Sequence, residues 1–262
     1  MKYPALIALT SALLLGLQAQ AETIEVYLVG GQSNCSGHAP AKDLSAKWQA
    51  PQADVFYSFK DDTGPLTPRE TFGPEVSFGR SMADYFKASG KKVALLQYAI
   101  GGTNLYAHWK GGGNATTAGD GNVYRDFQAS VAHGMAELKK THPGATIVLA
   151  GMIWMQGEAD AFVGRTDYVP NLTAFIGDIR KTYGSSLPFF IGQLSPSQTA
   201  IPKEKLEVVR KAQATVSSTV PHTYLVKTGE LPTIDHLHFT AAGQITLGED
   251  FAKVVQQNTP AR

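Results

Sequence analysis

Apolar runs of strand length alternate along this chain with segments of helical length, and this alternation is the strongest constraint on its fold. The run "TIVLAGMIW" is apolar at almost every position, which is typical of a parallel strand buried on both faces. Parallel strands need crossover connections, so the helical segments are expected to cover the sheet. The sequence therefore predicts an α/β fold, a three-layer α/β/α sandwich with a mainly parallel central sheet. The expected strands are 24–29, 55–59, 92–99, 146–154, 188–194 and 223–226, and the expected helices are 75–88, 124–140, 167–183, 203–217 and 240–257.

The first residues have the pattern of a signal peptide. Lys2 gives a basic start, residues 5–17 form an apolar run, and Ala19-Gln20-Ala21 is a small-residue cleavage pattern. The apolar run is shorter than the roughly 20 residues that a helix needs to cross a bilayer. We therefore expect residues 1–21 to be removed, residues 22–262 to form a single domain, and the protein to be exported to the periplasm or secreted.

Composition excludes several kinds of partner. The chain carries 23 Lys and Arg against 22 Asp and Glu, so no net field would hold nucleic acid or, after signal removal, an anionic membrane. Cys35 is the only cysteine, which excludes internal disulfides, and a lone thiol near a turn is more often packing than a nucleophile. The glycine-rich loop at residues 108–122 lacks phosphate-binding spacing, so no nucleotide is expected. A neutral or weakly charged partner is expected, with no cofactor.

Four polar segments fall where they would meet at one edge of such a sheet. Ligands of parallel α/β sheets bind outside the carboxyl ends of the strands, where the connecting loops gather. Three of the segments follow expected strands directly and the fourth precedes the last expected helix. They are "GGQSN" at 30–34, "AIGGTN" at 99–104, "WMQGEAD" at 154–160 and "DHLH" at 235–238.

Ser33, in the first of these segments, is a candidate nucleophile. A serine hydroxyl reacts only when it lies on an exposed turn within hydrogen-bond reach of a base. Gly30 and Gly31 are consistent with such a turn. Considered alone, however, the segment favours a serine that caps the following helix.

Asp235 and His238 supply the base that such a serine needs. Their spacing lets the carboxylate accept a hydrogen bond from one imidazole nitrogen while the other nitrogen faces a serine. On spacing alone, however, a helix cap and a surface residue are the favoured interpretation of the pair. His236 is a second, weaker candidate for the base.

The reaction would also need donors for a negatively charged oxygen. The backbone amides of Ser33 and of Gly101 or Gly102 could supply two, since glycine lets the main chain approach a ligand closely. The side-chain amide of Gln156 could supply a third, although a buried glutamine can serve only to tie loops together. Residues beside these motifs could contact substrate, whereas Trp154 is expected in the core. These substrate-binding candidates are Gln32, Asn104, Tyr106 and Trp109.

In their order, "GQSN", "GGTNLYAHW", "WMQGEAD" and "DHLHFTAAGQITLGEDFA" resemble the SGNH hydrolase superfamily, within it the carbohydrate esterase family 6 and sialate O-acetylesterase-like branch. The resemblance implies a flavodoxin-like sandwich and metal-independent removal of O-acetyl groups from sugars. It implies Ser33 as nucleophile, His238 as base and Asp235 as its orienting acid. Glu158 is an alternative acid, because some members of this branch have been argued to use that glutamate.

The function expected from these residues is that of a serine esterase acting on acetylxylan or a related acetylated glycan through an acetyl-enzyme. A sialate O-acetylesterase with the same mechanism is the alternative. A non-catalytic carbohydrate-binding module would need the aromatic loops but not the serine, histidine and aspartate together. A glycosidase could pair Glu158 with Asp160 or Glu75. A lipase or peptidase of the α/β-hydrolase type is disfavoured, because Cys35 occupies the second glycine of the Gly-x-Ser-x-Gly turn.

Overall fold

The computed structural model describes residues 22–111 and 121–259 and contains a seven-stranded sheet at the centre of the fold. The strand order is β4-β3-β6-β1-β7-β8-β9, and every pairing is parallel except that of β4 with β3. The strands are β1 (Thr23–Gly31), β3 (Gln52–Phe59), β4 (Asp62–Leu66), β6 (Lys92–Ala99), β7 (Thr146–Met155), β8 (Phe189–Gly192) and β9 (Thr223–Val226), and a separate small sheet pairs β2 (Ala39–Pro40) with β5 (Thr71–Phe72).

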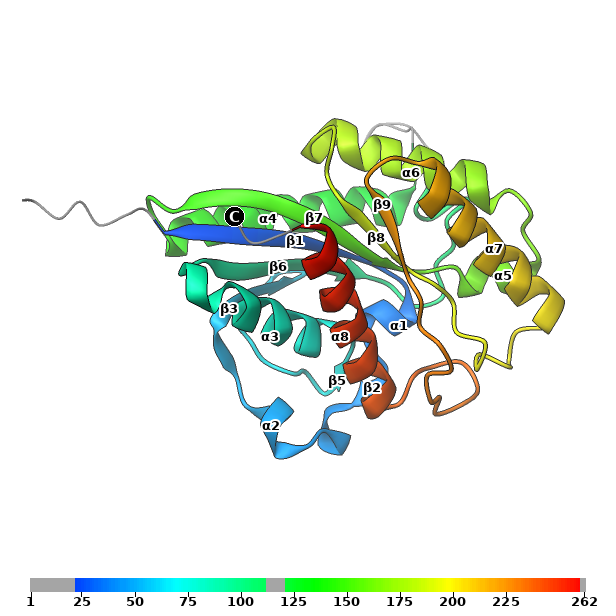
Figure 1. Ribbon diagram of the computed structural model, residues 1–262, viewed down its shortest axis with the longest axis horizontal. Helices are drawn as coiled ribbons and strands as arrows, with labels where there is room; N and C mark the ends of the chain where they lie inside the picture. Colours follow the sequence, from blue (N-terminus) through cyan, green and yellow to red (C-terminus); the bar gives the residue numbers. More distant parts are fainter. Residues whose placement is uncertain (1–21, 112–120, 260–262) are drawn as a thin grey trace, which may run out of the picture.

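Helices cover both faces of the large sheet (Figure 1). Helices α3 (Glu75–Phe86) and α8 (Ala241–Asn258) pack together on one face. The other face is covered by α4 (Asn122–Thr141), α6 (Tyr168–Tyr183) and α7 (Lys203–Thr219). The short elements are α1 (Ser33–Ser36), α2 (Ala46–Gln49), α5 (Glu158–Val163) and two 3-10 turns at Ala41–Asp43 and Lys87–Ser89. Within the described parts of the chain, no helix is both long and apolar enough to span a membrane.

The predicted fold class, an α/β/α sandwich with a mainly parallel sheet, is confirmed. All six expected strands and all five expected helices are present, with ends that shift by a few residues. The antiparallel edge strand β4 was not predicted, because its sequence "DTGPL" contains glycine and proline and shows no apolar alternation. It joins β3 through a tight turn in which Lys60 adopts a left-handed φ of 57°.

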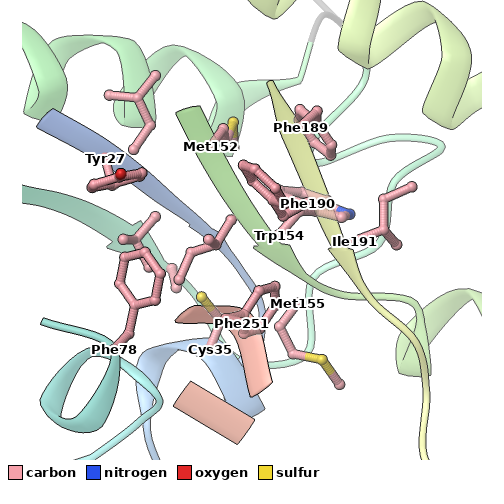
Figure 2. Packing of buried hydrophobic residues seen from close by; sticks show 14 of the residues in the cluster. Tyr27, Cys35, Phe78, Met152, Trp154, Met155, Phe189, Phe190, Ile191 and Phe251 are labelled. Atoms are coloured by element: carbon pink, nitrogen blue, oxygen red, sulfur yellow. The ribbon is translucent and has the colours of Figure 1, made fainter. Parts of the chain in front are cut away.

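The core lies between the sheet and its helices and is rich in aromatic rings. Figure 2 shows Trp154 close to Phe189 on neighbouring strands, with Cys35 and Phe78 on the other side of the sheet. The ring of Tyr27 meets that of Phe78 edge to face at 5.2 Å. Such packing stabilises the sheet by burying large apolar surfaces, so the carboxyl ends of the strands form a rigid platform.

The central strand β1 sets the position of the three loops that follow it and its two neighbours. The register pairs Gly31 with Ala99 of β6 on one side and with Met155 of β7 on the other. An ideal Cβ at Gly31 would lie 2.0 Å from the carbonyl oxygen of Met155, and Gly31 has a φ of 151°. Only glycine allows this approach. The loops after β1, β6 and β7 therefore leave the sheet side by side, as the sequence predicted.

Candidate active site

Ser33 is held on a tight turn between β1 and α1. The turn is tied to β7 by a hydrogen bond of 2.9 Å from the backbone amide of Gln32 to the carbonyl of Met155. Ser33 is the first residue of α1 rather than its cap, and the capping residue, Gln32, makes no side-chain capping bond. The capping alternative considered for Ser33 therefore does not describe this turn, which leaves the hydroxyl available to other partners.

The structure brings Ser33, His238 and Asp235 together. Nε2 of His238 lies 3.0 Å from Oγ of Ser33, although 205 residues separate them in sequence. Nδ1 of the same ring lies 2.7 Å from Oδ2 of Asp235. The imidazole thus bridges a hydroxyl and a carboxylate through its two nitrogens, which is the geometry that general-base activation of a serine requires.

Asp235 organises the loop that carries His238. Its Oδ1 accepts the backbone amides of Leu237 at 3.1 Å and of His238 at 2.7 Å, while its Oδ2 accepts from the ring. Partial burial would raise the pKa of Asp235, but the hydrogen bonds from the backbone and ring of His238 outweigh it and lower the pKa to about 2. The carboxylate is therefore ionised over the whole neutral range.

His38 is a residue of this site that sequence reasoning missed. Its ring stacks on that of His238, with centroids 4.2 Å apart and planes at 13°. Partial burial and then the neighbouring His238 lower the pKa of His38, so this imidazole stays neutral near pH 7. Nothing in the sequence around His38 indicates the stack, because it depends on a loop two hundred residues away.

An open pocket of about 450 Å³ lies in front of these side chains. Phe162, at 40 % exposure, and Leu237 supply apolar walls. Among the described residues that line it, none is a lysine, an arginine or a carboxylate. The walls are formed by Gln32, Ser33, His38, Gly101, Gly102, Ala159, Phe162, Leu237 and His238.

The two glycines after β6 face the candidate nucleophile across this pocket. An ideal Cβ on Gly101 would lie 3.5 Å from Cβ of Ser33, and Gly102 has a left-handed φ of 70°. The backbone of this loop therefore passes close to Ser33, as the sequence predicted. As the first residue of α1, Ser33 has a backbone amide with no intrahelical acceptor.

The prediction that Gln156 donates a hydrogen bond into the site is wrong for this structure. The side chain is fully buried and does not line the pocket. Its Nε2 lies 2.7 Å from Oδ2 of Asp160 and 3.1 Å from both the carbonyl of Thr103 and Oε1 of Gln32. These internal acceptors occupy the two protons of Nε2. Gln156 therefore ties loops together, which was the alternative to its role as a donor for the negatively charged oxygen.

Gln32 does lie at the pocket, as predicted, and its side chain has a fixed orientation. Besides Gln156, the backbone amides of Gly157 and Ala159 donate to Oε1 of Gln32, at 3.4 and 3.2 Å. Backbone amides are unambiguous donors, so the oxygen end of Gln32 must point inward. Gln32 lines the pocket, and with Oε1 held inward its Nε2 is the end of the amide directed to the pocket side in the described structure.

Of three other predicted substrate contacts, Trp109 is wrong in this structure, whereas Asn104 and Tyr106 lie outside the pocket walls and their substrate contacts stay predictions. Trp109 is fully buried, donates from Nε1 to Oγ1 of Thr103 at 2.9 Å and packs against Trp154, which lies in the core as predicted. Asn104 closes its own turn by accepting the backbone amide of Ala107. Tyr106 lies under the guanidinium of Arg165 instead of in the pocket wall. The phenyl ring of Phe162, in α5, does line the pocket. It was not predicted from the sequence, because its neighbours in the chain are also apolar.

The remaining alternatives for the base and for its acid lie elsewhere. His236 points its Nδ1 to Oγ1 of Thr199, at 3.4 Å, rather than to Ser33. Glu158 is 1 % exposed and hydrogen-bonds Asn34 and Gln198. Burial raises the pKa of Glu158. Of the two candidate acids, only Asp235 hydrogen-bonds the ring of His238 in the described structure.

The carboxylates of the glycosidase alternative do not face the pocket either. Glu158, Asp160 and Glu75 are all buried, and none lines the pocket.

In residues 22–111 and 121–259, no three His, Cys, Asp or Glu side chains are grouped as metal ligands would be. Cys35 is buried and donates to the carbonyl of Gly30, and burial raises the pKa of its thiol. It serves as packing in this structure.

Comparison with known proteins matches this chain to one family. The family model described as carbohydrate esterase, sialic acid-specific acetylesterase, matches residues 23–257. No curated protein sequence matches the chain.

Several solved structures share the fold. A protein from Arabidopsis thaliana aligns with a TM-score of 0.71 and 19% identity over 89% of this chain and 98% of its own. The protein NanS aligns with a TM-score of 0.62 and 16% identity over 90% and 98%. A carbohydrate acetylesterase from Xanthomonas citri aligns with a TM-score of 0.62 and 20% identity over 89% of this chain and 56% of its own. At these identities the likeness shows the fold alone.

Proposed function

Because the chain belongs to the sialic acid-specific acetylesterase family of carbohydrate esterases, we propose that it is a serine esterase that removes O-acetyl groups from carbohydrate. Family membership makes it a carboxylic ester hydrolase. The observation that carries the serine mechanism is the continuous path from Asp235 through His238 to Ser33, with contacts of 2.7 and 3.0 Å.

The proposed reaction has two acyl-transfer steps. His238 takes the proton of Ser33 as Oγ attacks the acetyl carbonyl, and the sugar alcohol leaves with that proton. Water, deprotonated by His238, then attacks the acetyl-serine, and His238 returns the proton to Oγ of Ser33 as the bond to the acetyl group breaks and acetate is released. Asp235 keeps the ring oriented and stabilises the imidazolium that forms in each step.

The negative oxygen of each intermediate would be held by the backbone amides of Ser33 and of Gly101 or Gly102. Such donors are worth a factor of about 10² to 10³ each in other acyl-transfer enzymes. Gln32 takes the place predicted for Gln156 as a third donor, because its oxygen is held inward and it lines the pocket. Gln156 would then contribute by orienting Gln32.

Two substrate classes compete. The described pocket walls carry no lysine or arginine to pair with the carboxylate of a sialic acid, which favours an uncharged acetylated glycan such as acetylxylan. The family description favours O-acetylated sialic acid as the second candidate. A non-catalytic binding module would leave the alignment of Ser33 and His238 without a purpose.

The test is acetate release by the purified protein from acetylated xylan, O-acetylated sialic acid and acetylated monosaccharides. Ser33→Ala should abolish release, while Ser36→Ala, on the same turn, should leave it nearly unchanged. A serine-directed phosphonate should label the wild type and not Ser33→Ala. Normal acetate release by Ser33→Ala would rule out the serine mechanism, and new reducing ends would indicate a glycosidase.

We also propose that residues 1–21, which lie outside the described residues, are a signal peptide, that residues 22–262 are the single mature domain, and that it acts in the periplasm or outside the cell. The support is the sequence pattern of the first residues. Protein recovered from outside the cytoplasm should begin at Glu22, which N-terminal sequencing will show.

A further inference from the structure

A buried polar cluster lies beside the active site, and none of its three residues lines the pocket. Asn34, Glu158 and Gln198, here called the anchor cluster, are each at most 1 % exposed. Asn34 follows Ser33 in α1, Glu158 begins α5, and Gln198 lies in the loop after β8. Three separate segments thus contribute uncharged and acidic groups to one point in the interior, where each group needs a partner.

Asn34 holds the loop that carries His238, here called the base loop, at the residues on both sides of that histidine. Its Oδ1 accepts the backbone amide of Phe239 at 3.0 Å, and its Nδ2 donates to the carbonyl of Leu237 at 3.2 Å. Nε2 of Gln198 donates to the same carbonyl, also at 3.2 Å. The residues before and after His238 are therefore bound to the residue that follows Ser33, so these contacts set the distance between the hydroxyl and the ring.

Glu158 fixes the direction in which the two amides point. Its Oε1 accepts from Nδ2 of Asn34 at 2.7 Å and from Nε2 of Gln198 at 3.2 Å. A flipped Asn34 would turn its oxygen toward this carboxylate and its NH₂ toward the amide of Phe239. Both contacts would then be repulsive, because each would pair two acceptors or two donors.

Glu158 makes no hydrogen bond to His238 in the described structure, and it is not needed there. The Nδ1 position of an imidazole carries one proton, and Asp235 already accepts it at 2.7 Å. We propose that Glu158 is a positioning residue: acting through Asn34 and Gln198, it holds the base loop so that His238 lies within hydrogen-bond reach of Ser33. This inference rests on the proposed serine-esterase function.

The test compares kcat and KM for p-nitrophenyl acetate in Glu158→Gln, Asn34→Asp and the double variant. Glu158→Gln keeps an oxygen that can accept from Asn34, so kcat should fall less than about tenfold, with an unchanged pH profile. Asn34→Asp puts a carboxylate against Glu158 and against the carbonyl of Leu237, so kcat should fall about 10²-fold at a similar KM, as expected for a misplaced base. In the double variant the introduced amide can donate to the introduced carboxylate, and part of the loss should be recovered, since the repulsion from the carbonyl of Leu237 remains.

The control is Glu75→Gln, which removes another buried carboxylate that bonds the backbone amide of Gly73 rather than Asn34. Combined with Asn34→Asp, it should recover much less activity than Glu158→Gln does. Urea unfolding of each variant shows that it is folded. The inference is overturned if Glu158→Gln loses as much kcat as Asp235→Asn, shifts the pH profile, or fails to rescue Asn34→Asp.

A second readout does not depend on turnover. The low-field NMR signal of the Nδ1 proton of His238 should persist in Glu158→Gln, shift in Asn34→Asp and vanish in Asp235→Asn. Its loss in Glu158→Gln would also overturn the inference. If the wild type hydrolyses no acetyl ester while this pattern holds, the proposed function fails and the positioning role of Glu158 stands.

Discussion

The imidazole rings of His38 and His238 lie face to face, with their centroids 4.2 Å apart and their planes at 13°. The lowered pKa of His38, which follows from its partial burial and from the neighbouring ring, keeps it neutral in the proposed step in which His238 accepts a proton from Ser33. A neutral ring can stabilise the imidazolium through its face, whereas a second charge would repel it.

Replacing His38 should therefore affect catalysis according to whether a ring is retained. His38→Ala should lower kcat by about 2- to 10-fold, the equivalent of the 0.5–1.5 kcal/mol that a stacked pair contributes. His38→Phe keeps a flat ring and should retain more of kcat. The measurement is the steady-state hydrolysis of p-nitrophenyl acetate. Equal kcat in His38→Ala and the wild type would show that the stack has no catalytic effect.

Replacement of Asp235 should lower activity steeply and change the acid stability. Asp235→Asn should reduce kcat by on the order of 10⁴-fold, because the ring loses the acceptor that fixes its tautomer. The pKa of Asp235 is lowered from 3.8 to about 2, so the carboxylate stabilises the fold above its unfolded pKa, and this contribution is lost as the pH falls toward 2. Asp235 is 52% exposed, so the contribution is small.

Urea unfolding of the wild type and of Asp235→Asn across the acid range tests the predicted change in acid stability. The difference in unfolding free energy between the wild type and Asp235→Asn should be constant above about pH 5 and shrink between about pH 4 and 2. A difference that does not change over this range would contradict the assigned ionisation of Asp235.

Phe162 should affect binding of the sugar rather than the chemical step. Its ring is 40% exposed at the pocket wall, and truncation to alanine should raise KM for an acetylated oligosaccharide by about fivefold, the equivalent of about 1 kcal/mol of lost apolar contact. The kcat for p-nitrophenyl acetate should change little. Val163, the next residue, is 59% exposed and does not line the pocket, so Val163→Ala is the matched control. Equal effects of the two changes would exclude a binding role for Phe162.

Gly31 should be far less replaceable than another glycine of similar backbone conformation. An ideal Cβ on Gly31, at a φ of 151°, would lie 2.0 Å from the backbone oxygen of Met155, while one on Gly184, at 137°, meets nothing within 4 Å. Gly184→Ala should cost about 1 kcal/mol of unfolding free energy, and Gly31→Ala about 3 kcal/mol or more, because β1 and β7 must move apart. Similar urea midpoints would show that the close contact is relieved cheaply.

The sheet was predictable from sequence because β1 and β6 are buried over almost their whole length and β7 over its last five residues, which leaves largely apolar runs. Strand β1 is buried over eight of its nine residues, which is why its limits were predicted within two residues at each end. The edge strand β4 has no such signal, since pairing on one side only allows polar residues, glycine and proline.

Sequence reasoning selected Ser33, Asp235 and His238, which the structure brings together, because they lie in two short polar motifs, one at the end of β1 and one before α8. It could not distinguish residues that face the pocket from those one layer below, and so Trp109 and Gln156 were misassigned. His38 and the partners of Glu158 were missed because each depends on a contact across the sheet edge, with no local pattern in the chain.

The contact between Ser33 and His238 joins positions 205 residues apart, and it has a practical use. On the proposed mechanism, a chain that has formed only its first strands is inactive, and so is one in which the loop that carries His238 has not yet docked. Hydrolysis of a chromogenic ester would begin only when the two ends of the sequence have met. Refolding experiments could thus use the onset of the colour change to measure the time at which the domain completes its assembly.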